Sequence, residues 1–187
     1  MSYRQELETA KKAALAAGQI LIEQKNNLNK SIFSSNKDIK LEADIVAEKL
    51  IKEILTDETS FPILAEESGQ SSDQLSDIFW VVDPLDGTAN YSRNIPICCV
   101  SIALIKNMKP VLGVIYDFSN NDLYEGSVNT LALQNGLEIK VSDISNQGEG
   151  ILITGLPNKT DYSDDALLKM VKDFQGWRKV RMIGSAA

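Results

Sequence analysis

The segment Phe79–Thr88, with the sequence FWVVDPLDGT, constrains the fold of this chain more than any other. Its apolar and β-branched first half favours a strand, and Pro84 fixes a turn that carries Asp83 and Asp86. The pair Gly87–Thr88 then has the composition of a helix start. Carboxylate oxygens are hard ligands that suit Mg²⁺, and amide groups at a helix start bind phosphate. The segment therefore predicts a metal site beside a phosphate site, a combination typical of phosphoryl chemistry.

Further segments accompany this motif. Ala65–Ser68 reads Ala-Glu-Glu-Ser, and Glu42–Asp44 reads Glu-Ala-Asp before a helical pattern. Together with Asp83–Thr88, these segments resemble the inositol monophosphatase family of metal-dependent phosphatases. The likeness covers nearly the whole chain, and its other segments are Ile95–Leu104, Gly113–Tyr116 and Arg181–Ala187.

The resemblance implies an α+β / α/β layered sandwich of the sugar-phosphatase-like αβαβα type. In the family, the segment that Gly184–Ala187 resembles continues into a Trp-Asp-x-Ala-x-Gly motif, whose Asp completes the metal site. No Trp-Asp pair occurs in this sequence. We therefore expect residues 1–145 to form the N-terminal metal- and phosphate-binding half, and residues 146–187 to form only the start of an incomplete C-terminal half. Such a chain would expose apolar surface and tend to self-associate.

Hydrophobic periodicity predicts helices at residues 4–26, 43–55 and 163–174, with Ser163 as the N-cap of the last one. Residues 26–36 have the composition of a polar loop, and Asn135–Gly136 is a strong hairpin signal. The pattern indicates an antiparallel meander flanked by the N-terminal helices. The expected strands are residues 61–65, 78–82, 98–105, 110–116, 123–125, 131–134, 137–141, 151–156 and 180–183.

The composition is that of an ordinary globular protein, with 43% hydrophobic and 24% charged residues. The net charge of −7 disfavours nucleic acid or an anionic membrane surface as the main partner. The absence of histidine excludes His-based triads and the usual zinc sites. Cys98 and Cys99 are adjacent, which suggests packing and no disulfide framework, and neither a signal peptide nor a membrane-spanning run is evident. A cytoplasmic location is therefore expected.

The family resemblance implies a site for two or three Mg²⁺ ions. Its motif places the ligands at Glu66, Asp83, Asp86 and the main-chain carbonyl of Leu85. Paired metal ions can position water, neutralise the phosphate and stabilise the leaving oxygen.

The resemblance also implies a catalytic group made of Glu66, Thr88 and Asp44. The Thr88 hydroxyl would orient the attacking water beside Glu66, and Asp44, from the second helix, would hold Thr88 in place. Taken alone, Asp44 could equally be a helix N-cap.

The residues expected to bind the substrate fall into two groups. Asp86, Gly87 and Thr88 would meet the phosphate, because the helix start offers free amides and because Gly87 has no Cβ to crowd the anion. The second group would contact substrate hydroxyls through its backbone, as in the family, or could equally be only a helix start. Its members are Gly184, Ser185 and Ala186.

The predicted function is Mg²⁺-dependent hydrolysis of a small phosphorylated metabolite. Ala89–Tyr91 after Gly-Thr resembles the inositol monophosphatase branch more than the nucleotidase branch, which usually continues with a Lys-Glu-Phe-like sequence. The expected substrate is therefore inositol monophosphate-like. Three alternatives stay open: a 3′(2′),5′-bisphosphate nucleotidase, a sugar bisphosphatase, and a catalytically incompetent metal-binding fragment. Because homodimers are common in the family, a homodimer is also expected.

Overall fold

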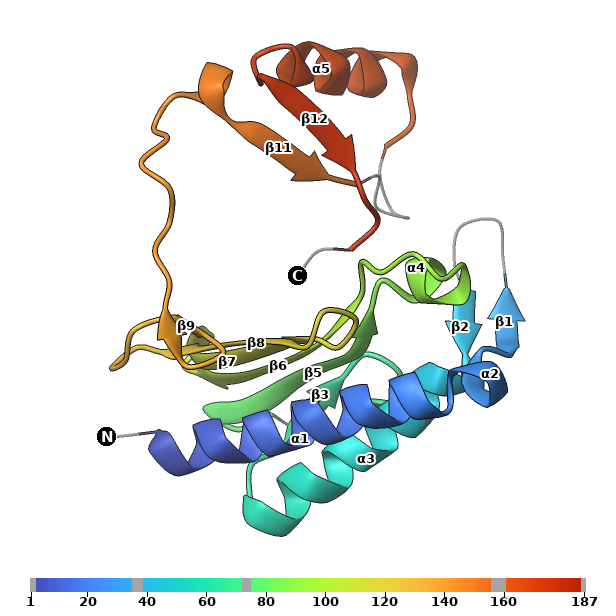
Figure 1. Cartoon of the computed structure of the whole chain (residues 1–187), viewed down its shortest axis with the longest axis vertical. Helices are drawn as coiled ribbons and strands as arrows, with labels where there is room; N and C mark the ends of the chain where they lie inside the picture. The colour runs from blue at the N-terminus through green and yellow to red at the C-terminus, as the bar shows by residue number, and fades with distance from the viewer. Residues whose placement is uncertain (1–2, 35–38, 72–74, 156–160, 186–187) are drawn as a thin grey trace. The chain divides into compact units, whose positions relative to one another are not determined.

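Two long helices, α1 (Arg4–Glu23) and α3 (Glu42–Glu58), lie side by side and cover one face of a β-sheet (Figure 1). The computed structural model describes residues 3–34, 39–71, 75–155 and 161–185. Within it the chain forms two compact units, Met1–Ile139 and Lys140–Ala186. The two helices and the sheet they cover belong to the first unit.

The α1 helix packs closely on the sheet because most of its inward residues are small. A Cβ on Gly18 would lie 2.4 Å from the ring of Tyr116 on β7 (Lys109–Asp117), so only glycine permits this approach. The helix ends at Glu23, before the predicted residue 26, and a short helical turn, α2 (Lys25–Leu28), follows it. The buried apolar residues of α1 are Leu7, Ala10, Ala13, Ala14, Ala17 and Leu21.

The main sheet runs through most of the first unit. Besides β7, its strands are β3 (Ile63–Ala65), β4 (Gly69–Gln70), β5 (Ile78–Asp86), β6 (Cys99–Lys106), β8 (Asp122–Ser127), β9 (Leu133–Gln134) and β10 (Leu137–Glu138). Among the described residues their order is β10-β9-β8-β7-β6-β5-β3-β4. From β5 to β10 each strand pairs antiparallel with the next, which confirms the predicted meander. Asn135 and Gly136, with φ of 50° and 79°, form the predicted turn.

A small hairpin precedes α3, where the sequence predicted only a polar loop. β1 (Ser31–Ser34) pairs antiparallel with β2 (Ile39–Leu41), and the chain enters α3 directly from β2. The loop prediction was wrong for these strands because each is too short to show a clear alternation of polar and apolar residues. Residues 35 and 36 of the predicted loop lie outside the described residues.

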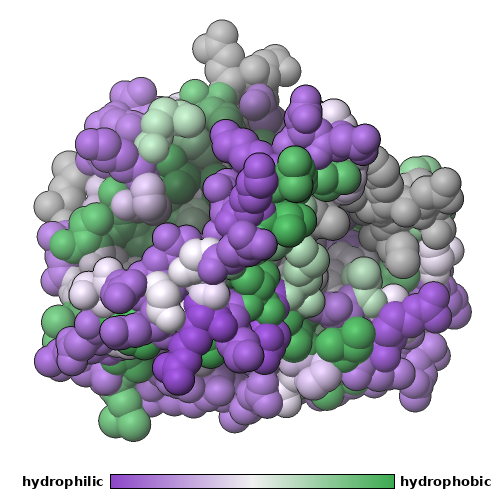
Figure 2. All heavy atoms as spheres, turned by 90° about the horizontal axis from the view of Figure 1, so that it is seen from above, coloured by the Kyte–Doolittle hydropathy of each residue, from purple (hydrophilic) through white to green (hydrophobic). Residues whose placement is uncertain are grey.

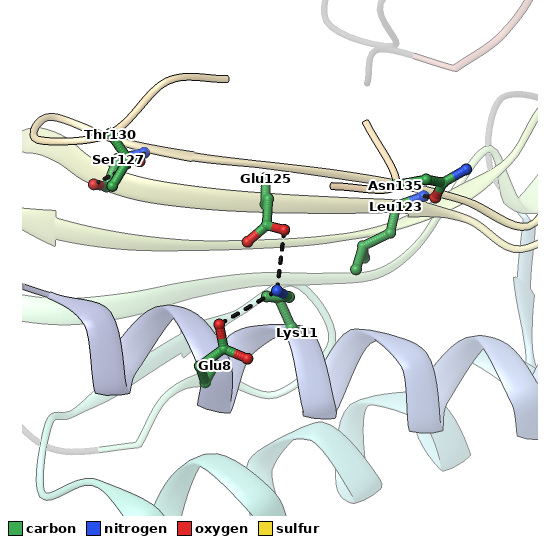
Figure 3. A network of polar contacts seen from close by, with 7 residues as sticks. All are labelled: Glu8, Lys11, Leu123, Glu125, Ser127, Thr130 and Asn135. Carbon is green, nitrogen blue, oxygen red and sulfur yellow. Dashed lines mark hydrogen bonds and ion pairs between the residues drawn. The ribbon is translucent and has the colours of Figure 1, made fainter. Parts of the chain in front are cut away.

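Lys11 ties α1 to the sheet through two carboxylates (Figure 3). Its Nζ lies 3.0 Å from Oε1 of Glu125 on β8 and 3.3 Å from Oε1 of Glu8 on α1 itself. Burial alone would lower the pKa of Lys11, but the hydrogen bonds to Glu125 and Glu8 outweigh it and the pKa is raised. Since the Glu125 side chain is only 9% exposed, Lys11 is the cation that balances a largely buried anion.

The second unit is built as a strand, a helix and a parallel strand. Its elements are η1 (Gln147–Glu149), β11 (Ile151–Thr154), α5 (Asp164–Phe174) and β12 (Lys179–Met182). β11 pairs parallel with β12. Ser163 occupies the predicted N-cap position, but its hydroxyl donates to Asp161 at 3.1 Å and makes no cap bond. Residue 156, the predicted end of the first strand, lies outside the described residues.

Apolar side chains remain exposed on the second unit, including Ile151, Ile153, Leu168 and Val171. Figure 2 shows hydrophobic residues, in green, interspersed with hydrophilic ones, in purple, over the face it displays. In the described parts of the chain, no helix combines the length and the apolar character that crossing a bilayer requires. The self-association expected from the sequence stays a prediction.

Candidate active site

A bulge in β5 sets the direction of the two signature carboxylates. Asp83 pairs with Ser101 of β6 and Asp86 pairs with Cys99, so two residues of β5 lie opposite a single residue of β6. In a regular strand, residues three apart point to opposite faces of the sheet. Because Ser101 and Cys99 are two apart, their partners lie on one face, and the bulge brings Asp83 and Asp86 to the same side.

The turn inside this bulge is closed by Asp83 itself. Its Oδ1 accepts a hydrogen bond from the backbone N–H of Leu85 at 3.1 Å, and Pro84 between them has no N–H to donate. The Leu85 side chain is buried, while its carbonyl accepts a 3.1 Å hydrogen bond from the Thr88 hydroxyl. The carbonyl predicted to bind metal therefore points toward the residue predicted to orient water.

Glu66 reaches the same place from β3. This strand pairs parallel with β5, and the N–H of Glu66 continues the pairing with a 3.1 Å hydrogen bond to the carbonyl of Val82. The Glu66 carboxyl group forms a hydrogen bond with that of Asp83. Burial, followed by the charge and hydrogen bond of Glu66 and the charge of Asp86, raises the pKa of Asp83 to about 8. The structure thus gathers three carboxyl groups whose negative charges repel one another.

This donor set fits a divalent cation of the Mg²⁺ type. Glu66, Asp83, Asp86 and the Leu85 carbonyl offer only oxygen atoms, and the negative charge around Asp83 is what a cation would neutralise. Across the residues that the structure describes, no three acidic, cysteine or histidine side chains already stand at metal-ligand spacing. Metal binding at this place therefore requires the side chains of the hydrogen-bonded Glu66–Asp83 pair to reorient.

Asp44 is almost completely buried in the first turn of α3 and uses both of its oxygens. Oδ2 accepts a 2.7 Å hydrogen bond from the N–H of Leu41, the N-cap residue, and Oδ1 accepts a 3.0 Å bond from the Thr88 hydroxyl. Burial raises the pKa of Asp44, with a smaller contribution from the charge of Glu66, against the opposing effect of these hydrogen bonds. Asp44 is thus not itself the N-cap but the third residue of the helix, and it both closes the helix start and holds Thr88.

Gly87 connects the bulge to α4 (Thr88–Ser92), the short helix that the sequence predicted. Its φ of 88° is left-handed, and a Cβ would lie 2.7 Å from the carbonyl oxygen of Ile97. The structure therefore gives a different reason for this glycine from the one expected: the turn and the neighbouring backbone require it before any anion does. α4 is held by Tyr91, which is fully buried and donates its hydroxyl to the carbonyl of Leu21 at 2.7 Å.

Cys99 lies closer to the site than its assignment as a packing residue suggested. It is buried, and its Sγ contacts Oδ2 of Asp86 at 3.9 Å. Burial, followed by the charges of Asp86 and Asp83, raises the pKa of the Cys99 thiol to about 12. Cys99 is therefore a neutral thiol beside a predicted metal ligand.

The second group of predicted substrate contacts belongs to the other unit. Gly184 follows β12 and has a left-handed φ of 72°, and Ser185 follows it. Ala186 lies outside the described residues. The role of Gly184, Ser185 and Ala186 stays a prediction. Sequence reasoning also assigned no role to Glu48, a buried carboxylate four residues after Asp44, although this spacing places both on one face of α3.

Comparison with known proteins gives the chain its relatives. The model of the Inositol monophosphatase family matches residues 2–187. The chain is similar to Nus factor SuhB of Xylella fastidiosa, with 37% identity over 186 residues that cover 94% of this chain and 65% of that protein. It is also similar to the fructose-1,6-bisphosphatase/inositol-1-monophosphatase of Aquifex aeolicus, with 34% identity over 187 residues that cover 97% of this chain and 70% of that protein.

Solved structures agree with these relatives. The structure of inositol monophosphatase from Anabaena (Nostoc) sp. matches with a TM-score of 0.85 and 33% sequence identity, and the match covers 99% of this chain and 69% of that one. The expected layered fold is confirmed by this likeness. The chain spans 65% of the length of the Xylella relative and 70% of that of the Aquifex relative.

Proposed function

Because the chain belongs to the inositol monophosphatase family, we propose that it hydrolyses a small phosphomonoester, of the inositol monophosphate type, with Mg²⁺ as the cofactor. Glu66, Asp83, Asp86 and the Leu85 carbonyl would hold the metal. When bound, Mg²⁺ would supply the positive charge that stabilises the phosphate and the leaving oxygen.

The arrangement around the Thr88 hydroxyl is the observation that carries this proposal. The hydroxyl has one proton and two acceptors, Oδ1 of Asp44 at 3.0 Å and the carbonyl of Leu85 at 3.1 Å. When the Leu85 carbonyl serves as a metal ligand, the proton is directed to Asp44. The lone pairs of Thr88 are then free to accept a hydrogen bond from the attacking water, which fixes the direction of its oxygen.

The start of α4 supports phosphate binding next to this group. The first amides of a helix have no partner within it, and Gly87 and Thr88 carry two such groups beside Asp86. The phosphate would thus meet the amides on one side and the acidic cluster, once its charge is neutralised, on the other. The left-handed conformation of Gly87 supports this orientation of the turn.

One further substrate class has support from a relative. The name of the Aquifex relative includes fructose-1,6-bisphosphatase as well as inositol-1-monophosphatase. A sugar bisphosphate is therefore the second candidate substrate for this chain. Behind it stand hydrolysis of a 3′(2′),5′-bisphosphate nucleotide and metal binding without catalysis.

A metal titration combined with a substrate panel tests the proposal. Isothermal titration calorimetry measures Mg²⁺ binding to the chain, and phosphate release is measured from inositol 1-phosphate, fructose 1,6-bisphosphate and adenosine 3′,5′-bisphosphate, with Mg²⁺ or with EDTA. Mg²⁺-dependent release that is fastest from inositol 1-phosphate supports the proposal. Faster release from either bisphosphate would replace the substrate, and a single weak metal site without any release would identify a metal-binding fragment.

A further inference from the structure

Glu48 is a buried carboxylate on α3 that the proposed chemistry does not use. Its side chain is only 4% exposed, and its Oε2 accepts a 2.8 Å hydrogen bond from the backbone N–H of Glu67. We infer that Glu48 is a positioning residue: it holds the turn after β3 so that the Glu66 carboxylate meets Asp83 at the metal site. The inference rests on the proposed function, because it concerns Glu66 as a metal ligand.

The backbone of Glu66 is fixed on both sides. Its own N–H donates to the carbonyl of Val82 at 3.1 Å, as the last bond of the pairing between β3 and β5. The next N–H, that of Glu67, lies beyond β3 and donates to the Glu48 carboxylate. Since these two amides flank the Cα of Glu66, the two bonds together set the direction of its side chain. The sheet supplies one of them and Glu48 supplies the other.

A single face of α3 therefore fixes both loops of the candidate site. Asp44 and Glu48 are four residues apart, a spacing that puts helix side chains on the same face, and both are buried. Asp44 holds Thr88, in the loop that follows β5, and Glu48 holds the turn that contains Glu66. The helix acts as a template for the separation between the two loops.

Two lysines balance the charge around the turn. The Nζ of Lys52 lies 4.0 Å from Oε1 of Glu48 and donates to the Ser68 hydroxyl at 2.8 Å. Lys40 forms an ion pair with the side chain of Glu67. These contacts reduce the cost of burying Glu48, and they leave its Oε2 for the Glu67 amide.

Two nearly isosteric substitutions separate the hydrogen bond of Glu48 from its charge. E48M removes both, whereas E48Q removes only the charge, because an amide oxygen can still accept from the Glu67 N–H. With Mn²⁺ as the probe, isothermal titration calorimetry should show about 10-fold or weaker affinity in E48M than in E48Q. I51V changes a fully buried residue of the same helix and controls for lost stability. It should lower Tm without weakening Mn²⁺ binding.

Hydrogen exchange tests the same bond in the unsubstituted protein, even if E48M does not fold. The Glu67 amide should be protected, although it lies beyond the end of β3. An unprotected Glu67 amide, or equal Mn²⁺ affinities of E48M and E48Q, would overturn the inference and leave the proposed function standing. Failure of the unsubstituted chain to bind Mn²⁺ would overturn the proposed function, and the inference with it.

Discussion

The hydroxyl of Thr88 lies 3.0 Å from Oδ1 of Asp44, although 44 residues separate the two in the sequence. The same hydroxyl lies 3.1 Å from the carbonyl of Leu85, three residues before it. A long-range contact and a local one therefore compete for a single proton. Occupation of the Leu85 carbonyl decides this competition in favour of Asp44.

Removal of the Thr88 hydroxyl should slow phosphate release while leaving metal binding intact. T88A is expected to lower kcat by about 100-fold or more, because the attacking water loses the group that orients it. T88S keeps the hydroxyl and should retain most of the rate. Mg²⁺ affinity, measured by calorimetry, should be similar in both variants. Unchanged turnover in T88A would rule out the pairing of Thr88 with Asp44 as the catalytic arrangement.

The metal-free protein should lose stability as the pH rises through the range set by Asp83. The pKa of Asp83 is raised from its ordinary 3.8 to about 8, first by burial and then by Glu66. The folded chain keeps a proton that the unfolded chain releases, so this contribution is complete below about pH 4 and is lost as the pH approaches about 8. In EDTA, the Tm of D83N relative to the unsubstituted chain should therefore rise between about pH 5 and about pH 8.

Glu53 provides the control for this pH series. It lies on α3 with a side chain that is 59% exposed, and E53Q should follow the unsubstituted chain at every pH. Mg²⁺ should flatten the difference between D83N and the unsubstituted chain, because a bound cation lowers the pKa of a carboxylate. A D83N curve parallel to that of E53Q in EDTA would contradict the assignment of the raised pKa.

The ion pair between Lys11 and Glu125 should contribute more to stability than an exposed pair does. K11M leaves the Glu125 carboxylate largely buried without its cation and should lower the free energy of unfolding by about 1–3 kcal/mol. The double variant K11M/E125M should recover most of this loss. K49M breaks the exposed Lys49–Glu53 pair and should cost about 0–1 kcal/mol. Denaturant unfolding measures all three, and equal losses in K11M and K49M would contradict the distinction.

Alanine at position 87 should destabilise the chain through both backbone strain and a clash. G87A combines a φ of 88° with a Cβ 2.7 Å from the Ile97 carbonyl, and the strain alone costs about 1–3 kcal/mol. Gly136 offers a matched control, because its φ is 79° and nothing lies within 4 Å of the added Cβ. G136A should therefore lose less stability than G87A in denaturant unfolding. Equal losses would mean that the loop before β6 moves away without cost.

Local features of the sequence determined much of this protein's fold. The spacing of small apolar residues fixed α1, the Asn135–Gly136 turn fixed a hairpin, and short β-rich runs between turn residues produced the meander. Each of these depends on residues close together in the chain, so periodicity and turn chemistry suffice to predict them. The motif Asp83–Thr88 likewise identified the family from sequence alone.

Only the tertiary structure decided how the site is assembled. The bulge that turns Asp83 and Asp86 to one face depends on pairing with β6, which lies later in the chain. The contact of Asp44 with Thr88 depends on how α3 packs beside β5, and so does that of Glu48 with Glu67 beside β3. Sequence patterns identified most of the carboxylates, but directions and partners follow from contacts between distant segments. Such contacts form only when burial of the core brings those segments together, and no local period records them.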